Sequence, residues 1–197
     1  MGMPPIGRLD RLEFTERGGV LIDLTDVGCW ILKGDPKTWD YFTALAEDQT
    51  PPVKPHVYPG GWTLGCTYRN DMIRKGDLIA LWITGPKNPG IYEFGSVTSD
   101  EPYEADGFDD RYALDHQRAQ EKAPAIDYAA VRLYENFVPR AEMKADPVLG
   151  ACEQFRAPQG ANPSYLDPDQ TKALAHLIAA RVPIARLKDA NWGRMLR

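Results

Sequence analysis

The sequence has few residues of the kinds that build redox or metal sites. Its three cysteines and three histidines are widely separated: Cys29, Cys66 and Cys152, and His56, His116 and His176. A disulfide framework needs paired cysteines, and a structural zinc needs clustered Cys or His ligands. We therefore expect no bound metal and no other cofactor, and we expect reduced thiols in a cytoplasmic protein.

Long apolar runs are also missing. No stretch approaches the roughly 20 residues of a membrane span, and the N-terminus lacks the basic and then apolar pattern of a signal peptide. The net charge of −5 argues against a protein that coats nucleic acid nonspecifically, because such binding requires many cations. We expect no membrane partner.

Glycine and proline, by contrast, are frequent. The 197 residues are 43% hydrophobic, which suffices for one core, and 17 Gly with 17 Pro are too many for an all-helical protein. Such punctuation is typical of small barrels and of α+β folds. Charge is uneven, because residues 100–127 form an acidic loop with nine acids and three bases, whereas residues 181–197 are basic.

A strand followed by a sharp turn lies near the start of the chain. Cys29-Trp30-Ile31-Leu32 is apolar, Gly34 permits a turn, and Asp35-Pro36 is typical of a helix N-terminus. We predict a helix from Pro36, with one apolar stripe formed by Trp39, Phe42, Leu45 and Ala46. Asp146-Pro147 and Asp167-Pro168 predict two more helix starts.

Further along, Gly60-Gly61 precede Trp62 and predict an aromatic side chain carried on a flexible loop. Residues 78–84 and 91–98 predict a β-hairpin, and residues 126–138 a further strand.

Five short motifs occur in order: Trp30-Ile31-Leu32-Lys33-Gly34-Asp35-Pro36; Arg69-Asn70 with Lys75-Gly76-Asp77; Pro89-Gly90-Ile91 with Gly95-x-Val97; Phe137-Val138-Pro139 with Glu142-Met143-Lys144; and residues 166–178. This series resembles the EVE domain of the PUA-like superfamily, which is related to the YTH readers of methylated RNA. Gly34 and Asp35 replace the family's Ser and Glu, which is similar to a branch associated with bacterial restriction systems. Pro124-Ala125-Ile126 stands where the family often has a tryptophan, so one wall of its aromatic pocket is missing here or comes from elsewhere.

The resemblance implies an α+β fold: a PUA-like small β-barrel of about five to six strands with helices packed around it. The expected organisation is an N-terminal hairpin or extension over residues 1–27, the EVE domain over residues 28–180, and a basic C-terminal extension over residues 181–197.

The resemblance also implies a non-enzymatic module that binds modified DNA or RNA. A flipped or unpaired base, such as 5-methylcytosine or 5-hydroxymethylcytosine, would enter an aromatic pocket, where stacking and a few polar groups recognise it. The expected pocket residues are Trp30, Lys33, Gly34, Asp35, Trp62, Thr63, Trp82 and Thr84, and the expected phosphate contacts are Lys37, Arg69, Asn70 and Lys87. Each tryptophan could instead be a core residue.

Two other functions are compatible with the residues. The acidic loop or the basic C-terminus could serve a protein-interaction module. Asp127, Glu142 and Lys144 have the spacing of a metal-dependent nuclease. The sequence does not choose between DNA and RNA, and it leaves the oligomeric state open.

Overall fold

The computed structural model describes residues 22–107 and 111–197, so most of the hairpin predicted within residues 1–27 lies outside the described residues. The strands are β1 (Cys29–Gly34), β2 (Val57–Thr63), β3 (Leu78–Ile83), β4 (Gly90–Val97), β5 (Tyr103–Ala105), β6 (Ala123–Arg132), β7 (Val138–Pro139) and β8 (Ser164–Leu166). The α-helices are α1 (Tyr41–Glu47), α2 (His116–Ala119), α3 (Arg140–Ala145), α4 (Glu153–Arg156), α5 (Pro168–Ala179) and α6 (Ile184–Asp189). Short 3-10 turns are η1 (Leu24–Asp26), η2 (Tyr68–Met72), η3 (Tyr134–Asn136), η4 (Leu149–Ala151) and η5 (Gly193–Leu196).

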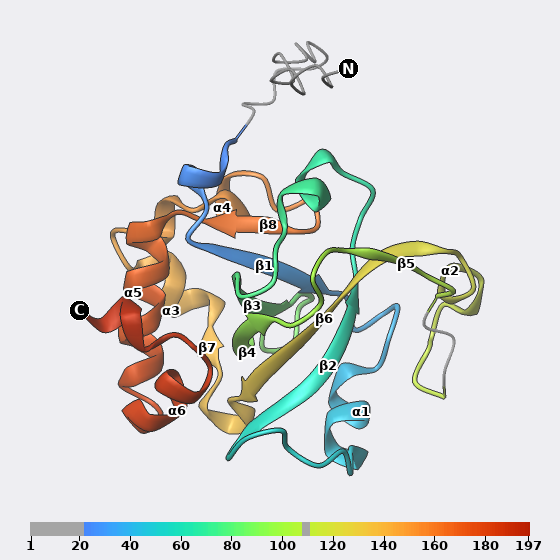
Figure 1. The fold of residues 1–197 in the computed structure, drawn as a ribbon, viewed down its shortest axis with the longest axis horizontal. Coiled ribbons are helices and arrows are strands. Elements are labelled where there is room, and N and C mark those ends of the chain that lie inside the picture. The colour runs from blue at the N-terminus through green and yellow to red at the C-terminus, as the bar shows by residue number, and fades with distance from the viewer. Residues whose placement is uncertain (1–21, 108–110) are drawn as a thin grey trace, which may run out of the picture.

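All eight strands belong to one sheet. Its main path runs β2-β6-β4-β3-β1-β8, with β5 added to β6 and β7 added to β4 (Figure 1). The β1–β3 pair is parallel and the other pairs are antiparallel. The mixed α+β class is therefore confirmed. The predicted small barrel of about five to six strands is not confirmed, because over the described residues the main path of the sheet has free ends at β2 and β8.

Side chains, rather than a ladder, connect β1 to β2. Asn162, in the loop before β8, accepts a hydrogen bond from the Lys33 backbone N–H at 3.0 Å and donates one to the Thr63 carbonyl at 3.5 Å. The Trp62 indole donates to the Lys33 carbonyl at 3.4 Å. An inserted loop thus occupies the space where direct strand pairing would close the sheet.

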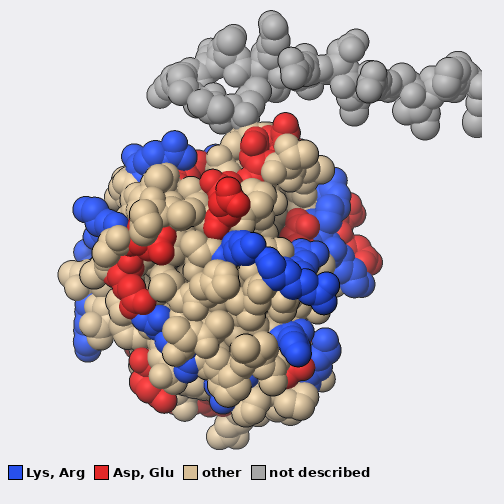
Figure 2. Space-filling model, turned by 90° about the vertical axis from the view of Figure 1, so that its left-hand side faces the viewer, with Lys and Arg blue, Asp and Glu red and all other residues tan. Residues whose placement is uncertain are grey.

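Two apolar clusters lie on the two faces of the sheet. Phe94 and Trp82 belong to the cluster that α5 and α6 cover, whereas Trp30, Leu32 and Tyr41 belong to the other. In Figure 1 the helices α3, α5 and α6 gather at one side of the sheet, and α1 lies beside β2. Figure 2 shows the helical side, where acidic and basic side chains are interspersed.

Several predicted elements are confirmed. The hairpin of β3 and β4 forms, and Asp167 caps α5 through a reciprocal capping box with Gln170. The helix predicted from Pro36 instead begins at Tyr41, because the segment before it pairs with distant chain: the Asp40 N–H donates to the Tyr112 carbonyl at 2.8 Å.

Three other expectations are corrected. Gly60 and Gly61 are not in a loop, since both pair with β6 within β2. The strand predicted over residues 126–138 is β6, which ends at Arg132 before a turn in which Tyr134 has a φ of 48°. Asp146-Pro147 leads only to the short η4 turn. Among the described residues no helix is long and apolar enough to cross a bilayer.

The C-terminal residues contribute to the core. Trp192 is fully buried, packs edge-to-face on Phe94 with ring centroids 5.7 Å apart, and donates from its indole to the Gly95 carbonyl at 2.8 Å. Residues 181–197 therefore take part in the packing of the sheet.

We expect Trp192→Ala to lower the free energy of unfolding by about 3–5 kcal/mol, because it removes a buried aromatic ring and its hydrogen bond to the Gly95 carbonyl. Urea denaturation measures the loss. Tyr134→Ala is the control, since Tyr134 is 44% exposed and should cost far less. Equal losses in the two variants would contradict this role of Trp192.

Candidate functional site

A cavity of about 760 Å³ opens between α1, β2 and the middle of the acidic loop. Its lining divides into three groups. The aromatic wall is Trp39, Trp62 and Tyr112; the floor is Tyr41, Glu93 and Tyr128; the charged rim includes Glu47, Asp48, Arg111 and Arg132. These residues come from segments spread over most of the described chain, so only folding brings them together.

The aromatic wall is a corner of rings that meet edge to face. Trp39 contacts Trp62 with ring centroids 6.2 Å apart and Tyr112 with centroids 5.9 Å apart. All three side chains are half-buried. Such a corner offers flat apolar surface to a planar ligand.

Gly34 lets the Trp62 ring approach β1. A Cβ at position 34 would lie 3.0 Å from the Trp62 ring, which is tighter than most real Cβ contacts, and 2.9 Å from the terminal methyl group of Ile83. The bare backbone at the end of β1 therefore determines where this wall of the cavity stands.

Glu93 is buried in the floor between two tyrosines. Its carboxylate accepts hydrogen bonds from the Tyr41 hydroxyl at 2.9 Å and from the Tyr128 hydroxyl at 3.3 Å. Burial raises the pKa of Glu93, while these hydrogen bonds and the nearby Arg132 act in the opposite direction. Burial, with the Glu93 charge second, raises the pKa of both tyrosines well above their ordinary range, so they keep their protons.

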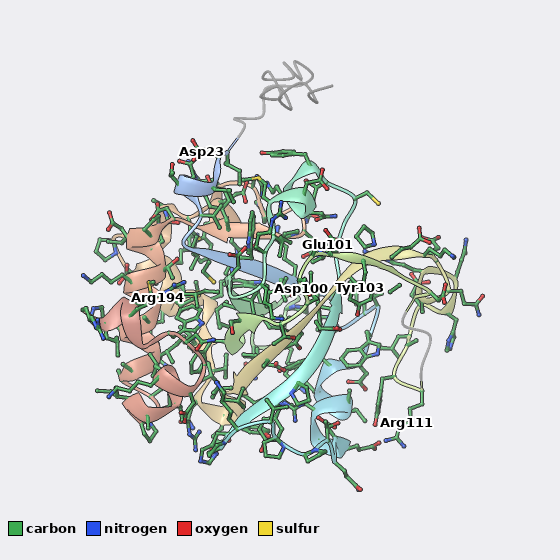
Figure 3. The ribbon with its side chains drawn as sticks, in the orientation of Figure 1. Asp23, Asp100, Glu101, Tyr103, Arg111 and Arg194 are labelled. Atoms are coloured by element: carbon green, nitrogen blue, oxygen red, sulfur yellow. The ribbon has the colours of Figure 1, made fainter. Side chains whose placement is uncertain are left out.

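Ion pairs form the rim. The Arg132 guanidinium pairs with Asp48 and lies 4.3 Å from the centre of the Tyr58 ring. Arg111 pairs with Glu47 at 2.9 Å and so joins the acidic loop to α1, at the far side of the sheet from α5 (Figure 3). These contacts hold α1 against the sheet and leave the mouth of the cavity polar.

Five of the predicted pocket residues meet at the end of β1. Besides the contacts of Trp62, Thr63 and Lys33 already described, the Thr84 hydroxyl donates to the Gly34 carbonyl at 2.9 Å. Of the predicted set, only Trp62 lines the cavity itself.

The remaining predicted pocket residues lie elsewhere. Trp30 is fully buried, and its indole donates to Asp77 at 3.0 Å. Trp82 is buried on the opposite face of the sheet against Phe155. Asp35 is exposed and caps its own turn by accepting from the Lys37 N–H at 3.0 Å. Both buried tryptophans thus occupy the core.

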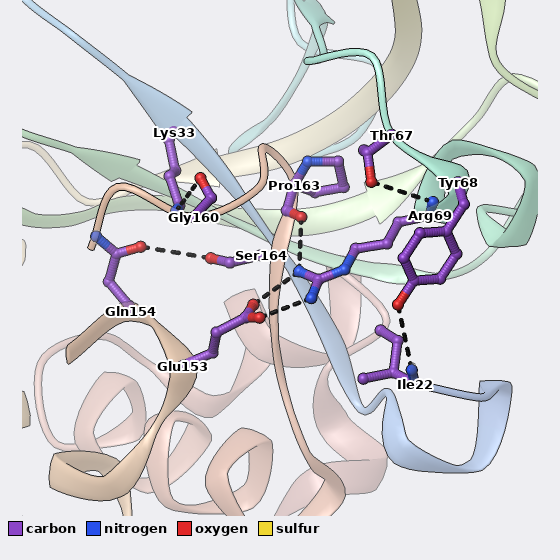
Figure 4. Close-up of polar contacts among 10 residues, drawn as sticks. All are labelled: Ile22, Lys33, Thr67, Tyr68, Arg69, Glu153, Gln154, Gly160, Pro163 and Ser164. Carbon is purple, nitrogen blue, oxygen red and sulfur yellow. Dashed lines mark hydrogen bonds and ion pairs between the residues drawn. The ribbon is translucent and has the colours of Figure 1, made fainter. Parts of the chain in front are cut away.

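The four predicted phosphate contacts separate into two kinds. Lys37 and Lys87 are exposed. Arg69 is buried and makes a bidentate pair with Glu153, at 2.8 and 2.6 Å, and a further bond to the Pro163 carbonyl at 3.2 Å (Figure 4). Asn70 donates to the Gly65 carbonyl at 2.9 Å. Arg69 and Asn70 therefore join η2 to neighbouring segments.

The residues of the nuclease alternative have other partners. Asp127 accepts from the Tyr103 hydroxyl at 2.7 Å, and Glu142 pairs with Arg181. Over residues 22–107 and 111–197 there is no group of three or more His, Cys, Asp or Glu side chains that could hold a metal ion.

Sequence reasoning missed most of the cavity. Trp39 was expected on a helix stripe, and Tyr41, Glu93, Tyr112 and Tyr128 were not predicted as site residues. One signal was present, since Glu93 is the single charged residue within the otherwise apolar and small β4 sequence. A charge in a buried strand is costly and therefore indicates a specific environment.

Comparisons with known proteins identify the fold. Residues 29–176 match the EVE domain. Human THYN1, crystallised in complex with 5-methylcytosine-containing DNA, is 16% identical with a TM-score of 0.54, covering 78% of this chain and 98% of its own. A Rhodopseudomonas palustris protein is 16% identical with a TM-score of 0.50, and the match covers 78% of this chain and 94% of that one. A Pseudomonas putida protein is 15% identical with a TM-score of 0.50, and the match covers 78% of this chain and 99% of that one. The comparison with curated proteins finds no match.

The raised pKa of Glu93 predicts a pH dependence of stability. Because the folded state holds this proton more tightly, stability should be lost as pH rises from the ordinary value of 4.5 through the folded pKa. Glu93→Gln cannot titrate, so its free energy of unfolding should rise relative to that of the wild type across this window. Urea denaturation at a series of pH values measures the difference. Glu135→Gln, at an exposed position, should run parallel to the wild type, and a parallel course for Glu93→Gln too would refute the assignment.

Proposed function

The chain belongs to the EVE domain family, and from this premise we propose that it is a nucleic-acid-binding module that holds a flipped or unpaired, modified base in the cavity beside Trp62. The proposal is one of binding without a catalytic step. DNA carrying 5-methylcytosine or 5-hydroxymethylcytosine is the ligand we test first, and RNA is its alternative.

The observation that carries the proposal is the cavity with its aromatic corner. Its volume of about 760 Å³ falls within the range of ligand sites, about 300–1,000 Å³. Trp39, Trp62 and Tyr112 offer ring surface on which a base can stack, and stacking contributes roughly 1–3 kcal/mol per base. The 5-methylcytosine DNA bound by human THYN1, a protein of similar fold, supports the choice of ligand.

Phosphates would lie on the turns beside β1 and β3. Lys37 and Lys87 are exposed on two turns that approach each other, since a Cβ on Gly85 would lie 3.9 Å from Pro36. A strand whose base enters the cavity beside Trp62 would pass these lysines. Contacts of this kind position the nucleic acid and carry no sequence information. Arg69, paired with Glu153, is left out of this set.

Trp62→Ala should weaken binding to a single-stranded oligonucleotide with one 5-methylcytosine by about five- to a hundredfold, which is the contribution of one stacked base. Fluorescence anisotropy measures the affinity. Trp82→Phe is the control, because Trp82 is buried on the other face of the sheet and its substitution should lower stability without changing affinity. A folded Trp62→Ala variant with wild-type affinity would disprove the proposal.

Lys37→Ala and Lys87→Ala should each flatten the slope of log affinity against log salt by about 0.7, the value for one phosphate contact on a single strand. The ratio of affinities for modified and plain cytosine should stay constant. Lys172→Ala, on α5 at the helical side, is the matched control and should change neither quantity. If Lys37→Ala or Lys87→Ala altered the base preference and not the salt slope, the lysine would belong inside the cavity.

A further inference from the structure

A β-bulge turns Glu93 toward the cavity. Leu81 of β3 is paired with Glu93, and the next residue, Trp82, is paired with Ile91, so Tyr92 is an extra residue in β4. Because side chains alternate along a strand, the extra residue moves Glu93 away from the face that carries Ile91. Bulges of this type re-aim a side chain and are over-represented beside active sites.

Gly60 gives the floor its shape. A Cβ at this position would lie 2.6 Å from the Tyr128 ring, so any larger residue would displace the tyrosine that contacts Glu93. The two tyrosines come from different elements, Tyr41 from α1 and Tyr128 from β6. Three separate features, the bulge, Gly60 and the pair of phenols, therefore determine the position of one carboxylate.

The floor presents hydrogen-bond acceptors. Each phenol has a single hydroxyl hydrogen, and the hydroxyl hydrogens of Tyr41 and Tyr128 are both donated to Glu93. What is left for a ligand is the set of lone pairs on the carboxylate and on the phenol oxygens. Arg132, whose charge favours the ionised form of Glu93, is itself paired with Asp48.

We propose that Glu93 is a specificity-determining residue whose carboxylate accepts a hydrogen bond from the exocyclic amino group of the bound ring, so that the cavity selects amino-bearing bases over carbonyl-bearing ones. This inference rests on the proposed function and names the substrate class of the same cavity. Cytosine presents an N4 amino donor where thymine presents the O4 acceptor. A thymine in the same place would set the lone pairs of its O4 against those of the Glu93 carboxylate. The carboxylate would then lack a donor at this position, and a site built to hydrogen-bond one ligand binds a ligand without the matching group much more weakly.

A purely structural role for Glu93 predicts something different. If the carboxylate served only to join α1 to β6, its substitution would weaken binding of all ligands alike, through the position of α1. The ratio of affinities for two ligands of equal shape separates the two roles, because it cancels changes in stability and in cavity shape.

The experiment compares two single-stranded oligonucleotides that differ at one position, 5-methylcytosine or thymine. These bases carry the same methyl group and differ at C4, which bears an amino group or a carbonyl, and at N3, which is an acceptor in 5-methylcytosine and an N–H donor in thymine. Affinities are measured by fluorescence anisotropy at mildly alkaline pH for the wild type, for Glu93→Gln and for Asp127→Asn. Asp127 is the matched control, because its carboxylate also accepts from a tyrosine hydroxyl but lies outside the cavity lining.

The wild type and Asp127→Asn should prefer 5-methylcytosine by about tenfold or more, and Glu93→Gln should lose or reverse this preference, since its amide can donate to O4. Equal binding of both oligonucleotides by the wild type, or an unchanged preference in Glu93→Gln, would overturn this inference while the proposed function stands. If neither oligonucleotide bound, the proposed function would fall together with it.

Discussion

The contact between Trp62 and the bare backbone of Gly34 is the constraint on which the cavity depends. It brings the end of β2 against the end of β1, where no ladder joins the two strands. Asn162 then fills the remaining space and satisfies backbone groups on both sides. A larger residue at position 34 would push the Trp62 indole outward. The position of this cavity wall and the approach of β2 to β1 therefore depend on the same contact.

Two carboxylates, the buried Glu93 and the half-buried Glu153, take different roles. Glu153 forms a bidentate pair with Arg69 that joins η2 to α4, and the Arg69 guanidinium also donates to the Pro163 carbonyl. Glu93 is held by two neutral phenols, and its cation is shared with Asp48. In the first arrangement the carboxylate is engaged by the arginine. The second leaves acceptor capacity facing a cavity, and this difference is the reason to assign ligand recognition to Glu93.

The candidate site was only partly predictable. The motif around Lys33, Gly34 and Asp35 pointed to the end of β1. Trp62 was predicted to be a ligand-facing aromatic on a loop, and the structure places it on a strand, where it lines the cavity. The sequence could not separate exposed basic residues from those in structural ion pairs, because Arg69 is paired with Glu153, 84 residues away along the chain. The partners of Trp39 in the aromatic wall, Trp62 and Tyr112, also come from other segments of the chain.

The sequence by itself determined the elements that local patterns specify. Apolar runs bounded by turns specified β1 and the β3–β4 hairpin, the Asp167 cap specified α5, and the ordered motifs specified the family. Only the tertiary structure decided where α1 begins, because Asp40 pairs with Tyr112, and which way Glu93 points, because the bulge exists only relative to β3. A shift of one residue in the pairing register turns every side chain of a strand to the opposite face of the sheet. The register depends on pairing between segments that lie far apart in the sequence, so the local sequence does not determine it.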